Sequence, residues 1–352
     1  MSNNKHTTIA LIIVILSLAL VFIKPTGAGW VEWEGKVYNE WNNGVSGAIV
    51  KLKQNNVVVK TTTTDSNGEY SLIYYTSSYA TYKITVTKED YNSQTKTVPK
   101  TSLGEPWVVD FNIRYVMKYA VIVGIEDYAY LNDLQYTEND ADAWYDFLCD
   151  TSLDFDEVDL YKGSNAYESA IKNALENMVN IADKGDIIAF IFSGHGYKKS
   201  STEHALSMWD ADGNGNTGYL YDSELATILT SSEAERIFLF FDCCYSYGMQ
   251  EELAEIGSKD HILLTSSCDK NEISYYDKAN EKSCWTQSFL VESWINNNEP
   301  EDPVIDVFND AIIYFRAHIT NGDDYYSTDQ NPQLWNPYGN NFRLTKYGIS
   351  PP

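Results

Sequence analysis

The 352-residue sequence predicts an α/β domain, a mostly parallel sheet flanked by helices, preceded by a small all-β sandwich domain. Two near-continuous apolar runs, residues 187–192 and 237–241, are typical of strands buried on both faces of a parallel sheet. Strand-like and helical segments alternate after residue 118, which indicates βαβ units. Residues 30–115 instead carry short β-branched runs between turns such as Asp65-Ser66-Asn67-Gly68, which favours antiparallel strands.

The individual elements follow from local patterns. In the first domain we expect strands at residues 49–52, 57–59, 61–64 and 82–87. In the second domain we expect strands at residues 121–123, 158–160, 187–192, 237–241 and 262–264. Helices are expected between them at residues 139–148, 167–182, 223–229, 288–295 and 303–318. Within 167–182, Ile171, Leu175, Met178 and Val179 share one face at helical spacing, so that face is expected to pack on the sheet.

Charge and the amino-terminal segment bear on partners and location. The formal net charge of −25 argues against a nucleic-acid partner, whose phosphates would be repelled. Residues 9–23 are almost wholly apolar, which makes residues 1–28 a signal peptide, with cleavage after Ala28, or a membrane anchor. Both alternatives predict an extracytoplasmic protein, secreted or held in the membrane by this segment alone. The five cysteines leave at least one thiol free within the chain. The sequence is compatible both with a Cys268–Cys284 disulfide and with two separate thiols.

Each of the two apolar runs ends at residues that can do chemistry. The first leads into Ser193-Gly194-His195-Gly196, and the second into Asp242-Cys243-Cys244-Tyr245-Ser246. Because ligands bind outside the carboxyl ends of parallel strands, His195 and Cys244 can meet there although 49 residues (244 − 195) separate them. A nearby imidazole activates a thiol as a nucleophile. We therefore expect a Cys-His dyad, with the Gly196 N–H as an oxyanion donor.

These two blocks, with residues 119–125, 134–141 and 263–267, resemble the caspase-like (clan CD) cysteine peptidases, and among them the metacaspase and prokaryotic caspase-like branch. The resemblance covers residues 118–345 and implies a cysteine endopeptidase acting on peptides or proteins. The family pattern Asp-x-Cys-x-Ser-Gly assigns the nucleophile to Cys244, although Tyr247 replaces the expected glycine. Residues 30–115 resemble the carboxypeptidase regulatory-like domain, a non-catalytic module for which we expect a surface partner.

The resemblance also implies a preference for Arg or Lys before the scissile bond, with Asp140 and Asp242 as substrate-binding carboxylates. An alternative role for Asp140 is a helix cap. No cofactor is expected for the chemistry. Calcium is expected only as an activator, with Asp212, Asp222 and Glu251 as metal ligands by the same resemblance. The alternative for the loop at residues 210–216 is a polar turn, since Tyr221 stands where an EF-hand loop needs Glu.

The sequence is also compatible with two other functions. One is a catalytically inactive caspase-like surface binding protein, and the other is a related thiol hydrolase or transpeptidase on the same fold. The polar segment 269–282 reads as an exposed loop whose lysines, Lys270, Lys278 and Lys282, would be self-cleavage targets of a peptidase that prefers basic residues.

Overall fold

The chain forms two compact units that divide between Tyr115 and Val116. The computed structural model describes residues 29–76, 80–100, 105–150, 153–256, 261–321 and 326–345. The expected signal peptide or anchor, residues 1–28, lies outside these ranges. Within them, no helix has both the length and the apolar character needed to cross a membrane.

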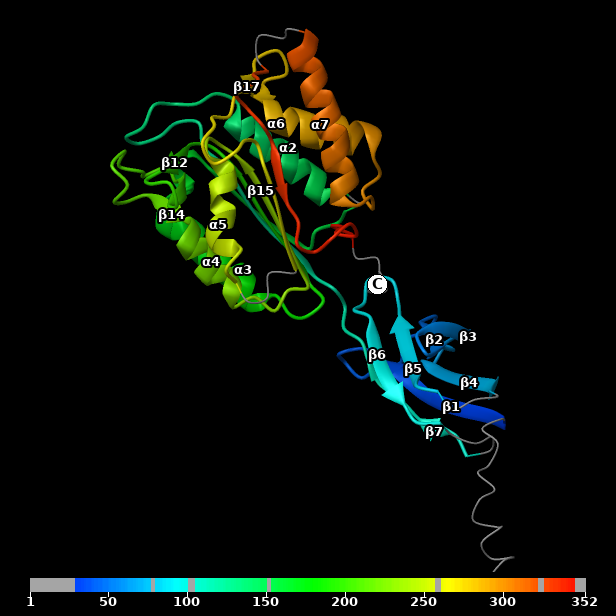
Figure 1. Cartoon of the computed structure of the whole chain (residues 1–352). Helices are drawn as coiled ribbons and strands as arrows, with labels where there is room; N and C mark the ends of the chain where they lie inside the picture. Colours follow the sequence, from blue (N-terminus) through cyan, green and yellow to red (C-terminus); the bar gives the residue numbers. More distant parts are fainter. Residues whose placement is uncertain are drawn as a thin grey trace, which may run out of the picture. The chain divides into compact units, whose positions relative to one another are not determined.

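The smaller unit is a sandwich of two four-stranded sheets, confirming the all-β prediction (Figure 1). One sheet pairs β1 with β4, β7 and β8, and the other has the order β3-β2-β5-β6. The two strands expected at 57–59 and 61–64 form the single strand β3, which pairs with β2 across a register shift. The bounds are β1 (Gly29–Tyr38), β2 (Ile49–Gln54), β3 (Val57–Thr63), β4 (Glu69–Thr76), β5 (Tyr82–Thr87), β6 (Gln94–Val98), β7 (Trp107–Val108) and β8 (Phe111–Asn112).

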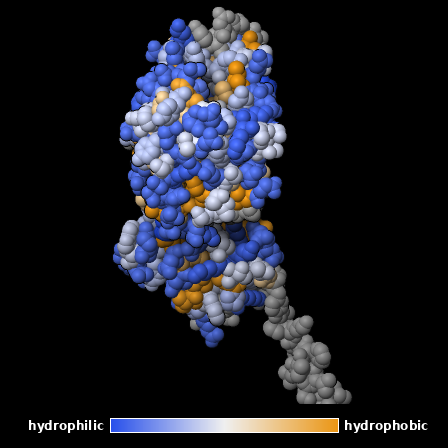
Figure 2. All heavy atoms as spheres, turned by 90° about the vertical axis from the view of Figure 1, so that its left-hand side faces the viewer, coloured by the Kyte–Doolittle hydropathy of each residue, from blue (hydrophilic) through white to orange (hydrophobic). Residues whose placement is uncertain are grey.

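The sandwich leaves several large apolar side chains on its surface. Trp30 on β1 and Tyr75 on β4 are opposite each other in the ladder, both more than half exposed, with ring centroids 5.4 Å apart. Trp107 and Val108 on the neighbouring strand β7 are also more than half exposed. Figure 2 shows apolar surface on this unit.

The larger unit contains a six-stranded sheet of order β10-β9-β11-β15-β16-β19, parallel except for β19. Its strands are β9 (Lys118–Gly124), β10 (Glu157–Lys162), β11 (Ile187–Ser193), β15 (Arg236–Asp242), β16 (Ile262–Ser266) and β19 (Gln333–Trp335). A small antiparallel sheet holds β12 (Gly196–Lys198), β13 (His204–Ser207) and β14 (Tyr219–Tyr221), and a hairpin pairs β17 (Tyr276–Asp277) with β18 (Lys282–Ser283). All five strands expected in this domain are present.

Helices cover both faces of the six-stranded sheet, so its central strands are buried throughout (Figure 1). One face packs against α3 (Glu168–Ile181), α4 (Asp222–Thr230) and α5 (Gln250–Leu253). The other packs against α2 (Thr137–Cys149), α6 (Cys284–Thr286), the π-helical segment η4 (Gln287–Ile295) and α7 (Val304–Asn321). Short 3-10 turns, η1 (Gly163–Asn165) and η2 (Ser246–Met249), complete the described elements. The predicted apolar face of α3 packs on the sheet, as Ile171, Leu175 and Met178 lie in that core.

The last residue of β9 sets how closely α2 approaches the sheet. A Cβ at Gly124 would lie 2.6 Å from the Ala141 Cβ and 2.6 Å from the Thr137 carbonyl oxygen. The absence of a side chain therefore lets the first turn of α2 lie directly on the carboxyl edge of β9. This contact holds Asp140, in that first turn, at the same edge as the ends of β11 and β15.

We predict that Gly124→Ala destabilises the larger unit by about 1–3 kcal/mol, because the added methyl must displace α2. The midpoint of thermal or denaturant-induced unfolding measures this. Gly29→Ala is the matched control, since a Cβ at Gly29 meets no heavy atom within 4 Å. Equal stability of the two variants would contradict this account of the α2 contact.

Candidate active site

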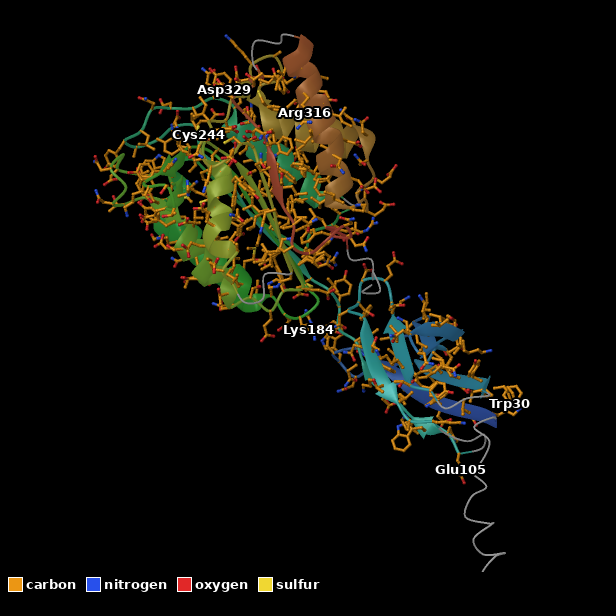
Figure 3. The ribbon with its side chains drawn as sticks, in the orientation of Figure 1. Trp30, Glu105, Lys184, Cys244, Arg316 and Asp329 are labelled. Carbon is orange, nitrogen blue, oxygen red and sulfur yellow. The ribbon has the colours of Figure 1, made fainter. Side chains whose placement is uncertain are left out.

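The register of β11 and β15 brings the two sequence blocks together. Ser193 and Asp242, the last residues of these strands, are paired across the parallel ladder. The chains that continue beyond them stay in contact, because a Cβ at Gly196 would lie 1.7 Å from the Cys244 carbonyl oxygen. In Figure 3, Cys244 lies at the opposite edge of the sheet from Lys184, which precedes β11. His195 and Cys244 therefore lie together at the carboxyl edge, as the sequence predicts.

Two residues that sequence reasoning did not single out hold His195. Its Nε2 lies 2.8 Å from the Asn132 carbonyl oxygen, an orientation that leaves Nδ1 for the thiol. The Tyr128 hydroxyl accepts a hydrogen bond from the His195 N–H at 2.8 Å and donates to the Ser207 carbonyl at 3.3 Å. The Tyr128 and imidazole rings have centroids 4.9 Å apart. Burial raises the pKa of Tyr128, so its hydroxyl stays protonated and acts as a neutral support.

The adjacent cysteines have different surroundings. Cys243 is buried in the core below the sheet edge, and burial raises its pKa well above the usual range. Cys244 is only half-buried. Burial, and next the negative charge of Asp242, raise the pKa of Cys244, whereas the Ser274 N–H, 3.4 Å from Sγ, opposes that shift. The accessible thiol is thus Cys244, and it rests in the protonated form that needs a base.

The Gly196 N–H is available for an oxyanion. The Ser207 N–H donates to the His195 carbonyl at 2.9 Å, one position before the first pair of the β12–β13 ladder. In an antiparallel ladder the next pair, Gly196 with Leu206, is non-hydrogen-bonded, so the Gly196 N–H points away from β13. Together with the Cys244 N–H it has the chemistry to bind an oxyanion.

Asp140 and Asp242 form a buried pair of carboxyl groups at the same edge of the sheet as Cys244. Asp140 is fully buried and accepts hydrogen bonds from the Ser193 hydroxyl and from the Ser283 N–H and hydroxyl. Its side chain caps no helix end, as α2 has no side-chain cap. Asp242, 2% exposed, accepts from the Ser274 hydroxyl at 2.8 Å and from the Thr286 N–H and hydroxyl, both at 2.9 Å.

This pair has hydroxyl partners but no cation. Among the described residues, no lysine or arginine forms an ion pair with either carboxyl group. Burial, and then the charge of Asp242, raise the pKa of Asp140 from 3.8 to about 7. Burial also raises the pKa of Asp242. Such a site is favourable for a guanidinium or ammonium group, which would supply the missing counter-charge.

The three residues expected to bind calcium are not brought together. Asp212 lies in the β13–β14 loop and accepts hydrogen bonds from the loop's own Asn214 and Asn216, so the polar-turn alternative describes its contacts. Asp222 is buried at the start of α4 and accepts from the His204 N–H. Glu251 pairs with Lys270 at 2.5 Å. Within the described residues no group of three acidic, His or Cys side chains has the geometry to hold a metal ion.

The segment after Cys244 accommodates the departure at Tyr247. Tyr245 has a left-handed backbone (φ 61°), and its N–H donates to the Glu272 carbonyl at 2.8 Å. Gly248 packs directly on the His204 ring, where a Cβ would lie 2.2 Å from the imidazole. The glycine needed in this turn is therefore one residue later than in the family pattern. Cys268 and Cys284 are both buried and both free, so no disulfide joins them.

We predict that Asp140→Asn stabilises the chain at neutral pH by on the order of a few kcal/mol. A carboxyl group whose pKa is higher in the folded state makes stability fall as pH rises from about 4 to about 7, and the loss is complete above that range. Asparagine removes this loss and keeps an oxygen for the Ser283 N–H.

Unfolding free energies of both chains between pH 4 and pH 8 check this prediction. Asp146→Asn, on the exposed side of α2, is the control for charge removal. The prediction is contradicted if the difference in unfolding free energy between wild type and Asp140→Asn does not grow with pH.

Comparisons with known proteins identify the family of the chain. Sequence models of two families match the chain, the caspase domain over residues 117–336 and the carboxypeptidase regulatory-like domain over residues 34–114. No curated protein sequence matches it. Among solved structures, protein GSU0716 from Geobacter sulfurreducens aligns with a TM-score of 0.47 at 16% identity, covering 64% of this chain and 97% of that one. Caspase-1 from Spodoptera frugiperda aligns with a TM-score of 0.46 at 14% identity, covering 66% and 91%.

The two family matches coincide with the two units of the structure. The caspase-domain match contains the six-stranded sheet, and the other match falls within the sandwich. Since the first match spans more than half of the 352 residues, the chain belongs to the caspase-domain family and carries a carboxypeptidase regulatory-like domain ahead of its caspase domain.

Proposed function

We propose that this protein is an exported cysteine endopeptidase that uses a Cys244–His195 dyad and cleaves after Arg or Lys. The observation that carries the proposal is the contact of Gly196 with the Cys244 carbonyl, beside a buried and cation-free carboxylate pair. That contact joins a half-buried thiol, an oriented imidazole and an unused backbone N–H at one edge of the sheet.

The chemistry follows from these groups. His195 accepts the proton of the Cys244 thiol as Sγ attacks the scissile carbonyl carbon, because burial keeps the resting thiol protonated. The N–H groups of Gly196 and Cys244 bind the oxyanion, and His195 then gives its proton to the departing amine. Water, deprotonated by the same imidazole, hydrolyses the thioester and restores the thiol.

The preference for a basic residue before the scissile bond follows from the carboxylate pair. Asp242 lies two residues before Cys244 and shares its hydrogen-bonding partner Ser274 with it, which supports a position of the pair next to the attacked carbonyl. A bound Arg or Lys side chain would supply one positive charge to the pair, lower the pKa of Asp140 and so favour release of the proton that burial lets Asp140 hold near neutral pH.

Export and the role of the sandwich belong to the same proposal. The apolar run at residues 9–23 supports export through a signal peptide or anchor. The exposed pair Trp30 and Tyr75, with ring centroids 5.4 Å apart, supports a docking role for the sandwich, since exposed apolar surface marks interaction sites. Calcium activation rests on the family resemblance, and the chelator experiment below decides it.

We predict that Cys244→Ala lowers cleavage of Arg- and Lys-containing reporter peptides by at least about 1,000-fold, since covalent catalysis is lost. Cys243→Ala is the matched control and should retain cleavage, because that thiol is buried. Reporters with Asp before the scissile bond should remain uncut. Activity that survives in Cys244→Ala, or fails in Cys243→Ala with the fold intact, would refute the assignment. Equal rates in calcium and in chelator would remove calcium as an activator.

We also predict self-cleavage after Lys278. This lysine is exposed in the turn between β17 and β18, with no hydrogen bond or ion pair found for it among the described residues. Lys270 is instead paired with Glu251. Lys278→Gln should slow the conversion of the chain into two fragments, followed by gel electrophoresis and mass spectrometry, whereas Lys184→Gln, also exposed, should not. A chain that stays whole while it cleaves reporters would contradict this prediction.

A further inference from the structure

The sheet β3-β2-β5-β6 of the sandwich is basic, although the chain as a whole is acidic. Its four strands contain no Asp or Glu and five lysines, namely Lys51, Lys53, Lys60, Lys83 and Lys96. The chain has 50 acidic and 25 basic residues, whereas residues 29–115 have nine of each. The excess of negative charge therefore lies outside the sandwich, and the sandwich has one positively charged sheet.

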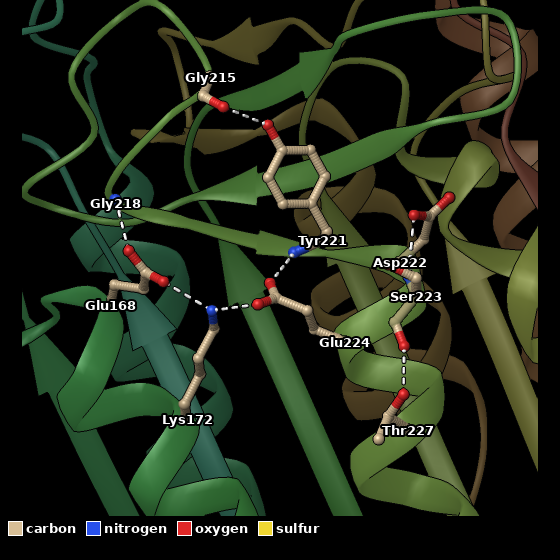
Figure 4. Close-up of polar contacts among 9 residues, drawn as sticks. All are labelled: Glu168, Lys172, Gly215, Gly218, Tyr221, Asp222, Ser223, Glu224 and Thr227. Carbon is tan, nitrogen blue, oxygen red and sulfur yellow. Dashed lines mark hydrogen bonds and ion pairs between the residues drawn. The ribbon is translucent and has the colours of Figure 1, made fainter.

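The lysines of this sheet lack the carboxylate partners that lysines have elsewhere in the structure. Lys172 on α3, for example, bridges Glu168 and Glu224, each at 2.6 Å (Figure 4). For the five lysines of the sheet, the described part of the chain provides no ion pair. An anion from outside the chain can therefore supply their counter-charge.

Two of these lysines lie directly opposite each other. Lys53 on β2 pairs with Lys83 on β5, and Lys51 leaves β2 on the same side as Lys53 because it lies two residues before it. We call these three residues the lysine face. Like charges opposite each other in a ladder are unfavourable. The Lys83 Nζ donates to the Asn56 side-chain oxygen at 3.2 Å, but this acceptor is neutral and leaves the repulsion in place.

The lysine pair lies at the end of the sandwich where β1 begins. Gln54, the residue after Lys53, donates from its side chain to the Thr76 hydroxyl at 3.3 Å. Thr76 is in turn paired with Gly29, the first residue of β1. A short series of contacts thus connects the lysine pair to the point at which the chain enters the sandwich.

The sequence before β1 brings this end of the sandwich close to any membrane that the apolar run at residues 9–23 enters. Ile23 precedes Gly29 by six residues, so the connection spans at most about 20 Å. Trp30, more than half exposed, stands at this end (Figure 3), and Tyr75 is its equally exposed partner in the ladder. Tryptophan and tyrosine rings favour the headgroup level of a bilayer. In an anchored protein, the end with the lysine pair therefore lies next to the headgroups.

We propose that the lysine face binds the phosphate groups of lipid headgroups and holds the sandwich on the membrane surface. The proposal rests on the export proposed above, with residues 9–23 kept as an anchor, and adds a second membrane contact to it. Lipid phosphates supply the anions that the lysines lack, while the Trp30 and Tyr75 rings enter the interface beside them. The larger unit carries the negative charge of the chain and is repelled by the same phosphates, so the contact belongs to the sandwich.

A fluorescent label on the full chain tests the proposal in phosphatidylcholine vesicles, with and without the anionic lipid phosphatidylglycerol. Cys149→Ser and Cys244→Ala first remove the accessible thiols, and Val58→Cys then places the label opposite Lys53 in the β2–β3 ladder. Val108→Cys is the matched control, because Val108 is a similarly exposed valine of the other sheet. With anionic lipid, we expect nitroxide-bearing lipids to quench the label at position 58 at least about twofold more strongly than at position 108. Salt should reduce this difference.

Removal of the lysine pair tests which side chains make the contact. Lys53→Gln together with Lys83→Gln should weaken the quenching at position 58 by at least about twofold. Lys36→Gln together with Lys88→Gln removes the same charge and should leave the quenching unchanged. Lys36 is paired with Glu69 on the other sheet, and Lys88 follows the opposite end of β5 from Lys83.

The outcomes separate this inference from the peptidase. Equal quenching at the two label positions, equal effects of the two lysine pairs, or no response to anionic lipid and salt overturns the lipid contact. A chain that does not float with the vesicles, or a label that is shielded by soluble polyphosphate and not by vesicles, also overturns it. Reporter cleavage by the wild-type chain is measured in the same vesicles. Cleavage without membrane contact overturns only this inference, and contact without cleavage removes only the peptidase.

Discussion

The close approach of two strand ends, those of β11 and β15, determines the rest of the site. Their ladder pairs Ser193 with Asp242, so the loops that follow leave the sheet side by side. Gly196 then lies against the Cys244 carbonyl, where no residue with a Cβ fits. This contact determines where the imidazole, the thiol and the oxyanion donor lie relative to one another. Preorganisation of this kind supplies catalysis without reorganisation during the reaction.

The neighbouring carboxylate pair shows how binding and stability oppose each other here. Asp140 and Asp242 are buried close together, and four hydroxyl-bearing residues, Ser193, Ser274, Ser283 and Thr286, supply hydrogen bonds without charge. Two like charges in such a site are unfavourable until a cation arrives. In the proposed function, this unfavourable charge in the free protein is what favours a basic side chain, and it lowers stability near neutral pH.

Periodicity and composition were sufficient to predict the sheet, because apolar runs such as residues 187–192 can only be buried on both faces. The strand-end rule then predicts that His195 and Cys244 follow neighbouring strands at the carboxyl edge, where β11 and β15 end side by side. Tyr128 and Asn132 were missed because their roles depend on a hydroxyl contact and a backbone carbonyl, neither of which leaves a sequence signal. The loop at residues 210–216 was ambiguous for the same reason. An Asp-Gly-Asn pattern fits both a calcium loop and a turn whose carboxylate binds its own backbone, and only the contacts of the folded loop distinguish them.

Inactivation by an acyloxymethyl ketone with Arg at the recognition position tests the central claim, that the strand ends join His195 to Cys244 at a site for basic side chains. Mass spectrometry of the labelled chain identifies the modified residue, and the inactivation rate is compared between wild type and His195→Ala. The account predicts a label on Cys244 and a rate at least about tenfold lower in His195→Ala, because the imidazole no longer takes the thiol proton. A label on Cys243, or equal rates in the two chains, would contradict it.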